Sequence, residues 1–228
     1  MGTRLTHIPF DIETTGFETS AQVTVVGFGL PLGCRVFLNA DGRPADGESL
    51  QASLAATFDP AIRLSVHASE PALLEAVAAF CADTLAPREY LLVAYNGERF
   101  HGGFDLPFLR TRCARQGRDW PFDGIPYADI LPLVQDRFNT TAAGEDHDDL
   151  VGAYEELVGG PLSARDPFAD SGAAVDAFAA GEFQPLLAHN LADIRRTGAL
   201  AALARQYCGT SEFSLRSLTP TARDPDLS

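Results

Sequence analysis

The sequence of 228 residues contains no lysine, so all of its 17 basic residues are arginines. Its 31 acidic residues give a formal net charge of −14 and a pI near 4.6. This acidic, lysine-free composition resembles that of proteins from halophilic archaea. Because charges at about 1 M salt are screened over roughly 3 Å, the net charge is weak evidence against a nucleic-acid partner. The positions of individual arginines therefore matter more than their sum.

Cysteines are few and far apart, and none forms a Cys-x-x-Cys pair (Cys34, Cys81, Cys113 and Cys208). Their spacing argues against a structural zinc site or a disulfide framework, and favours a reducing, cytoplasmic location. No apolar run is long enough to cross a membrane, and Asp11 and Glu13 interrupt the first one. We therefore expect neither a signal peptide nor a membrane partner.

Hydrophobic residues make up 46% of the chain, which is ample for a core. We predict one domain over residues 1–218 and a frayed tail at 219–228. Strands are expected at 5–15, 22–30, 34–38, 90–95 and 125–130, with a less regular strand-like segment at 62–67. Short turns join the first three strands, which predicts an antiparallel meander. The continuous apolar character of 90–95 indicates the interior of a parallel or mixed sheet.

Helices are predicted where apolar residues recur with helical spacing, the first of them capped by Ser69. Their ranges are 69–85, 106–118, 150–158, 173–180 and 183–207, and polar loops are expected at 39–49 and 140–149. Together with the strands, this pattern predicts an α/β fold with a mixed five-stranded sheet flanked by helices.

The first chemically informative stretch is Phe-Asp-Ile-Glu-Thr-Thr-Gly at residues 10–16. Alternate side chains of a strand point to the same face, so Asp11 and Glu13 project together. Two neighbouring carboxylates are unfavourable unless a cation lies between them, and Mg²⁺ and Mn²⁺ prefer carboxylate oxygens. We interpret the pair as half of a metal site. The alternative is an ordinary acidic end of a strand.

The second stretch follows the strand at 90–95, where an Asn96-Gly97 turn leads through a Gly-rich loop to Asp105. Asp105 stands where a helix begins, so one interpretation is a plain helix cap. The other is functional, because α/β sheets gather their sites at the carboxyl ends of central strands.

The third stretch is His-Asn-Leu-Ala-Asp at residues 189–193 in the last helix. A spacing of four residues places His189 and Asp193 on one face of that helix, one turn apart. The imidazole and the carboxylate could together serve a metal-bound water. The alternative is a surface pair on an amphipathic helix.

In this order the three stretches resemble the motifs of the DEDD superfamily of 3′–5′ exonucleases, which have a ribonuclease H-like fold. The resemblance extends from Phe10 to about Leu200. Asn96 with Phe-Asp-Leu-Pro-Phe-Leu at 104–109 is similar to the second motif of family B polymerase proofreading domains. Two features depart from the family. His189 stands at the spacing usual for tyrosine, and an insertion at 98–103 lengthens the loop of the second motif, which could reshape the groove or bring His101 near the substrate.

The resemblance implies that two Mg²⁺ or Mn²⁺ ions are bound by four carboxylates, Asp11, Glu13, Asp105 and Asp193. It implies that His189 orients or deprotonates the attacking water. The expected contacts to the terminal nucleotide and its phosphates are Thr14, Thr15, Phe17, Asn96, Phe104 and Arg110. Other arginines of the helix at 106–118, and Arg195 and Arg196, fit either phosphate contacts or a solvated face.

The function implied is removal of nucleotides from the 3′ ends of single strands, with DNA as the first choice of substrate and RNA as the second. Two alternatives stay open at this point. One is a catalytically inactive nucleic-acid-binding module, and the other is a structure-selective endonuclease, because one fold can carry either.

Overall fold

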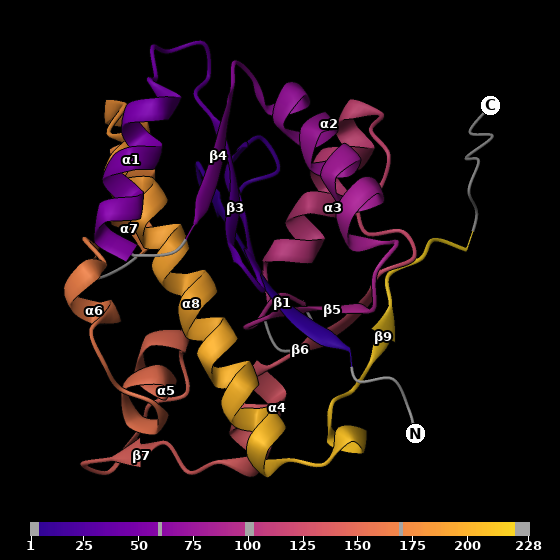
Figure 1. Ribbon diagram of the computed structural model, residues 1–228, viewed down its shortest axis with the longest axis vertical. Coiled ribbons are helices and arrows are strands. Elements are labelled where there is room, and N and C mark those ends of the chain that lie inside the picture. Colours follow the sequence, from indigo (N-terminus) through magenta and orange to yellow (C-terminus); the bar gives the residue numbers. More distant parts are fainter. Residues whose placement is uncertain (1–4, 59–60, 99–102, 169–170, 222–228) are drawn as a thin grey trace.

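The computed structural model describes residues 5–58, 61–98, 103–168 and 171–221, and places one mixed sheet between two layers of helices (Figure 1). The main sheet contains β1 (Thr6–Thr14), β2 (Val23–Leu30), β3 (Gly33–Asn39), β4 (Ile62–His67), β5 (Tyr90–Ala94), β6 (Pro126–Asp129) and β9 (Arg216–Ser217). The strands lie in the order β4-β3-β2-β1-β5-β6-β9. A separate hairpin joins β7 (Thr141–Ala142) and β8 (Glu145–Asp146).

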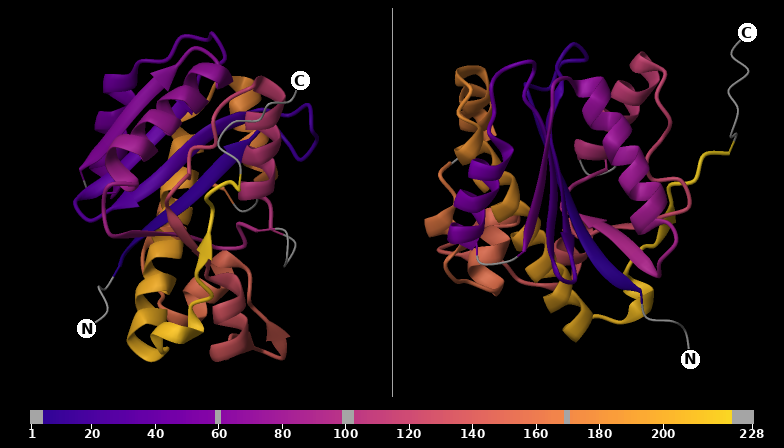
Figure 2. Two further views of the ribbon diagram at one scale, coloured as in Figure 1. Left: turned by 90° about the vertical axis from the view of Figure 1, so that its right-hand side faces the viewer. Right: turned by 45° about the horizontal axis from the view of Figure 1, so that its top comes forward.

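The helices are α1 (Gly47–Phe58), α2 (Glu70–Phe80), α3 (Asp105–Gln116), α4 (Leu131–Arg137), α5 (Leu150–Leu157), α6 (Leu162–Arg165), α7 (Ser171–Ala180) and α8 (Phe183–Tyr207). A π-helical turn (Cys81–Leu85) extends α2, and a 3₁₀ turn (Thr210–Glu212) follows α8. Helices α2 and α3 cover one face of the sheet, while α1 and α8 cover the other; the second view of Figure 2 shows the strands between the two groups. No helix in the described ranges is long and apolar enough to span a membrane.

The predicted α/β class is confirmed, as is the antiparallel meander of β1, β2 and β3. Strand β5 is parallel to both β1 and β6, as expected for a buried interior strand. The predicted number of five strands was wrong, because the sheet has seven. Strand β4 adds to β3 in parallel, and β9 adds two residues antiparallel to β6. Both are edge strands, whose pairing comes from long-range contacts more than from a local pattern.

Three helices were missed by the sequence prediction: α1, α4 and the four-residue α6. Helix α1 begins within the predicted loop at 39–49, where Oδ1 of Asp46 accepts hydrogen bonds from the backbone N–H groups of Glu48 and Ser49. Helix α4 begins two residues after Asp129. The predicted loop at 140–149 contains the β7–β8 hairpin. Ser69 does precede α2, but its side chain makes no capping hydrogen bond.

Alternation along β1 divides its side chains between the two faces of the sheet. Ile8, Phe10 and Ile12 pack in the core beneath α2 and α3. Pro9, Asp11 and Glu13 are the alternate positions, and they face α8. The alternation predicted for Asp11 and Glu13 thus directs both carboxylates toward one helix.

Helix α8 can lie close to β1 and β2 because Gly27 carries no side chain. A Cβ atom at Gly27 would lie 2.2 Å from Oδ1 of Asn190 and 2.3 Å from Cδ1 of Ile194. Both neighbours are buried, and the amide of Asn190 is held by its hydrogen bond to Asp11. Neither side chain can therefore move aside cheaply.

Gly27→Ala is expected to lower the free energy of unfolding by about 1–3 kcal/mol, because the added methyl group overpacks the contact between α8 and the sheet. Gly209→Ala is the control, since its Cβ would meet no atom closer than 3.5 Å. Urea unfolding of both variants measures the difference. Equal decreases in the free energy of unfolding for the two variants would show that close packing at Gly27 is unimportant for stability.

Candidate metal centre at the ends of β1 and β5

A cleft of about 230 Å³ lies at the carboxyl ends of the parallel neighbours β1 and β5. Ligand sites in α/β sheets commonly occupy this position. Its lining brings together residues from β1, the loop after β5, the start of α3, and helices α7 and α8: Asp11, Ile12, Glu13, Thr14, Gly16, Phe17, Tyr95, Asn96, Phe104, Asp105, Gly172, Val175, His189 and Asp193. The four predicted carboxylates and His189 thus line one cleft, although they come from three segments that are far apart in the sequence.

Asp105 is the first residue of α3, and Phe104 occupies the N-cap position. The turn after β5 holds this helix start, because the backbone N–H of Leu106 donates to the carbonyl of Gly97 over 2.9 Å. Among the described residues, no group donates a hydrogen bond to the carboxylate of Asp105. The plain-cap interpretation of Asp105 was therefore wrong.

Asp129, at the end of β6, fixes the turn after β5. Its Oδ1 accepts from the backbone N–H of Asn96 over 2.9 Å, and its Oδ2 accepts from that of Glu98 over 3.1 Å. Oδ1 also accepts from the N–H of Leu131 at the start of α4. These bonds hold Asn96 in a left-handed conformation with φ of +62°, at the edge of the cleft.

Burial and mutual repulsion oppose ionisation of the carboxylates in the cleft. Burial raises the pKa of Asp11 well above its usual range, and the charges of Glu13, Asp105 and Asp193 raise it further. Burial likewise raises the pKa of Glu13 to about 8, although nearby His189 acts to lower it. Burial and the charge of Glu13 also raise the pKa of Asp105. Such a group of carboxylates is favourable in its ionised form only with added positive charge.

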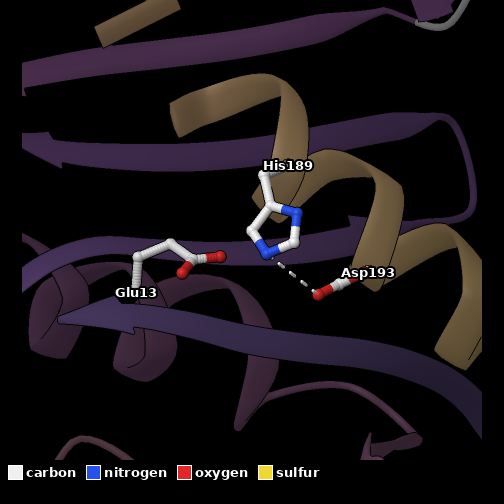
Figure 3. A group of neighbouring side chains, drawn as sticks. All are labelled: Glu13, His189 and Asp193. Atoms are coloured by element: carbon white, nitrogen blue, oxygen red, sulfur yellow. Dashed lines mark ion pairs between the residues drawn. The ribbon is translucent and has the colours of Figure 1, made fainter. Parts of the chain in front are cut away.

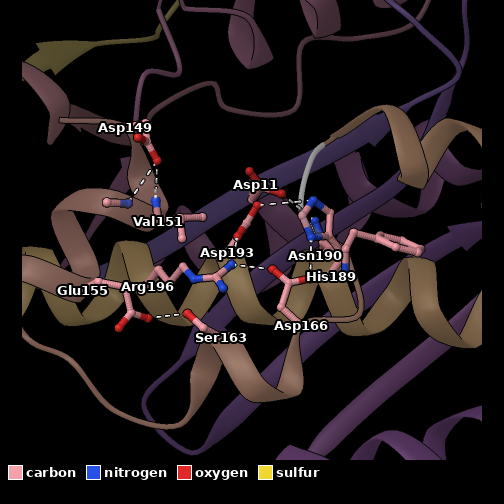
Figure 4. Close-up of polar contacts among 12 residues, drawn as sticks. Asp11, Asp149, Val151, Glu155, Ser163, Asp166, His189, Asn190, Asp193 and Arg196 are labelled. Carbon is pink, nitrogen blue, oxygen red and sulfur yellow. Dashed lines mark hydrogen bonds and ion pairs between the residues drawn. The ribbon is translucent and has the colours of Figure 1, made fainter. Parts of the chain in front are cut away.

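A buried polar network holds the two predicted residues of α8 (Figure 4). Nδ1 of His189 lies 2.8 Å from Oδ1 of Asp166, in the loop after α6. Arg196 donates from one nitrogen to Asp166 and to Asp193, over 2.6 Å in both cases. Asp166 therefore connects His189 to Arg196, and Arg196 occupies one oxygen of Asp193.

The ionisation of His189 follows from this network. Burial acts to lower the pKa of His189, but the hydrogen bond to Asp166 and the charges of Glu13 and Asp193 outweigh it and raise the pKa to about 9. Burial also acts to raise the pKa of Asp166, but its bonds to His189 and Arg196 lower it. Without an added cation, His189 is therefore the main positive charge facing Glu13.

Glu13, His189 and Asp193 form a close group of possible metal ligands within the described ranges (Figure 3). One atom from each lies within 4.8 Å of one atom from each of the others. Asp11 adds a carboxylate whose Oδ2 accepts a hydrogen bond from Nδ2 of Asn190 over 2.8 Å. Carboxylate oxygens with one imidazole suit a divalent cation, so the residues present fit the predicted metal.

Some of the predicted substrate contacts line the cleft and others lie outside it. The Phe17 side chain is 79% exposed at the edge of the cleft, and its ring packs edge-to-face on that of Phe104, with centroids 5.1 Å apart. Thr14 also lines the cleft, whereas the Thr15 hydroxyl accepts a hydrogen bond from the backbone of Gln22 and lies outside the lining.

Arg110 also lies outside that lining. Its guanidinium is 3.6 Å from a carboxylate oxygen of Glu98 and lies over the ring of Trp120. His101, which the insertion might have brought to the site, lies outside the described residues.

Sequence reasoning missed the roles of Asp166, Asn190 and Arg196. Asp166 precedes His189 by 23 residues, and no local periodicity connects the two. Asn190 adjoins His189 in the third motif, so its position was a usable signal. Arg196 was expected to contact phosphate or to lie on a solvated face, but both interpretations were wrong because its side chain is buried in ion pairs.

No family model matches the chain, and a search of curated proteins finds no match either.

Proposed function

We propose that this protein is a metal-dependent 3′–5′ exonuclease with a ribonuclease H-like fold, acting on single-stranded nucleic acid. One observation carries the proposal: Asp11, Glu13, Asp105 and Asp193 line the same cleft as His189. Buried carboxylates with raised pKa values need cations to ionise together. Two divalent ions, when bound, would activate a water and stabilise the leaving oxygen of a phosphodiester.

The chain's own residues have separable tasks in this proposal. The four carboxylates hold the cations, and Asn190 fixes the orientation of Asp11. Arg196 holds Asp193, which leaves the other oxygen of Asp193 directed toward His189. Asp129 fixes the turn that carries Asn96 to the edge of the cleft. Asn190 and Arg196 come from α8 and Asp129 comes from the end of β6, so the site depends on how these separate elements pack.

A single strand is the favoured substrate because of the aromatic edge of the cleft. Phe17 exposes most of its ring, and base stacking on such a ring is worth about 1–3 kcal/mol for any base. A cleft of about 230 Å³ suits the end of one strand better than a duplex. Single-stranded DNA remains the first choice of substrate, and single-stranded RNA remains the second. A structure-selective endonuclease on the same fold is the competing activity.

The test is degradation of end-labelled single-stranded DNA and RNA in high salt, with Mn²⁺ or with a chelator. We expect shortening from the 3′ end only when Mn²⁺ is present, and no shortening of a strand blocked at that end. Cleavage of the blocked strand would indicate an endonuclease. If no strand is degraded with Mn²⁺, the enzyme proposal fails and a binding module becomes the better interpretation.

A further inference from the structure

His189 presents an available nitrogen to the candidate metal centre. Its side chain is only 7% exposed, and Nδ1 is engaged by Asp166. Nε2 lies 3.7 Å from Oδ2 of Asp193, which is too long for a hydrogen bond. Among the described residues, Nε2 has no hydrogen-bond partner. An imidazole nitrogen of this largely buried side chain thus faces the carboxylates of Glu13 and Asp193 without a hydrogen bond to either (Figure 3).

The spacing of these three side chains suits a shared ion. Ligand atoms about 2.1 Å from an octahedral ion lie about 3 Å apart when adjacent and about 4.2 Å apart when opposite. The separation of 3.7 Å between Nε2 of His189 and Oδ2 of Asp193 lies between those values. A direct ion pair between imidazolium and carboxylate would instead be shorter.

Asp166 has the position of a group that orients a metal-binding histidine. Histidine ligands commonly donate their other ring N–H to a carboxylate, which selects the tautomer and fixes the ring. Oδ1 of Asp166 lies 2.8 Å from Nδ1, and its Oδ2 accepts from Arg196 over 2.6 Å (Figure 4). The side chain of Asp166 is only 3% exposed. The guanidinium of Arg196 and the backbone N–H of Phe168 donate hydrogen bonds to its carboxylate and hold it in place.

We propose that His189 binds one of the divalent cations directly through Nε2, together with Glu13 and Asp193, and that Asp166 is the positioning residue for its ring. This inference rests on the proposed metal centre and changes the role of His189 from a group acting on water to a ligand. Because Mg²⁺ favours oxygen ligands, an imidazole ligand favours a first-row transition metal such as Mn²⁺. Arg196 occupies one oxygen of Asp193, so we infer that this aspartate offers the ion a single oxygen.

The test uses Mn²⁺ as the probe and the full chain. Electron spin echo envelope modulation detects a nitrogen bound to Mn²⁺, and protein labelled with ¹⁵N-histidine identifies that nitrogen as imidazole. We expect a histidine-nitrogen signal in the wild type and its loss in His189→Gln. His147→Gln is the matched control, since His147 pairs with Glu156 on the surface, and it is expected to keep the signal.

Mn²⁺ and Mg²⁺ affinities, measured by calorimetry, provide the second readout. His189→Gln is expected to weaken Mn²⁺ binding at least about tenfold and Mg²⁺ binding less. Asp166→Asn, which keeps the imidazole, is expected to weaken Mn²⁺ binding by about 10–100-fold. This second variant keeps the inference testable if His189→Gln does not fold.

The outcomes separate this inference from the proposed function. Tight Mn²⁺ binding without a histidine-nitrogen signal, or a signal that survives in His189→Gln, would overturn ligation by His189 and leave the metal-dependent nuclease standing. Unchanged Mn²⁺ affinity in Asp166→Asn would overturn the positioning role. Failure of the wild type to bind Mn²⁺ would overturn both proposals.

Discussion

Asp11→Asn is expected to reduce metal-dependent hydrolysis of single strands at least about a hundredfold. Loss of a residue that merely orients a metal ligand costs about 10–100-fold, and loss of a ligand should cost more. Asparagine keeps the shape of the side chain and an oxygen that can accept from Asn190, so the effect reports the lost charge. Initial rates on labelled DNA with saturating Mn²⁺ in high salt measure it.

The same substitution is not expected to destabilise the protein when the metal is removed. The pKa of Asp11 is raised in the folded chain by burial and by its carboxylate neighbours, so the folded state holds this proton more tightly than the unfolded state does. Without metal, folding must therefore keep a proton on Asp11 that the unfolded chain releases, and this cost to stability grows as pH rises from the unfolded pKa toward the folded pKa. Neutral asparagine removes that cost. Unfolding in a chelator should show equal or higher stability.

Asp149→Asn is the matched control for activity. Asp149 caps α5 by accepting from the backbone N–H groups of Val151 and Gly152, and asparagine is an equally good cap. The Asp149→Asn variant should hydrolyse single strands at the rate of the wild type. If Asp11→Asn retains wild-type activity while Mn²⁺ still stimulates the reaction, Asp11 does not hold a required cation.

The second large effect is expected in stability, for Arg112→Met. The carboxylate of Glu70 accepts from Arg112 Nε over 2.8 Å and from a terminal nitrogen of Arg112 over 2.5 Å. It also accepts from the backbone N–H of Val23, and Arg112 donates to the carbonyl of Thr19. Removing one partner of a buried ion pair costs about 3–5 kcal/mol, because the carboxylate of Glu70 then stays buried without an opposite charge.

A surface ion pair between the same two segments provides the control. Arg118, just beyond the end of α3, lies 3.3 Å from Glu75 of α2, and both side chains are well exposed. Since exposed pairs contribute about 0–1 kcal/mol, Glu75→Gln should change the free energy of unfolding by less than about 1 kcal/mol. Urea unfolding of both variants gives the comparison. A decrease of less than about 1 kcal/mol in the free energy of unfolding of Arg112→Met would show that the buried ion pair adds little to stability.

The buried pair also connects stability to the site. It joins the start of β2 and the segment around Thr19 to α2 and α3, and that segment follows Phe17 at the edge of the cleft. Sequence reasoning treated Arg112 as a phosphate contact or as part of a solvated helix face. Both interpretations were wrong, because only the approach of α2 to α3 gives this arginine a buried partner.

The sequence by itself determined those features of the structure that depend on residues close together in the chain. Alternation directed Asp11 and Glu13 to one side of β1, and helical spacing placed His189 and Asp193 on one face of α8. Short turns determined the antiparallel meander of β1, β2 and β3. These patterns are local, so they can be read before the chain is folded.

Only the tertiary structure decided which groups surround those residues. The contact between α8 and Gly27 brings Asn190 to Asp11, and the position of the loop after α6 brings Asp166 to His189. The edge strands β4 and β9 likewise depend on pairing across long stretches of chain. Such contacts depend on how separate elements pack, and no periodicity within one segment encodes them. The carboxylates on β1 were thus visible as half of a site, whereas the surroundings of His189 became visible only in the fold.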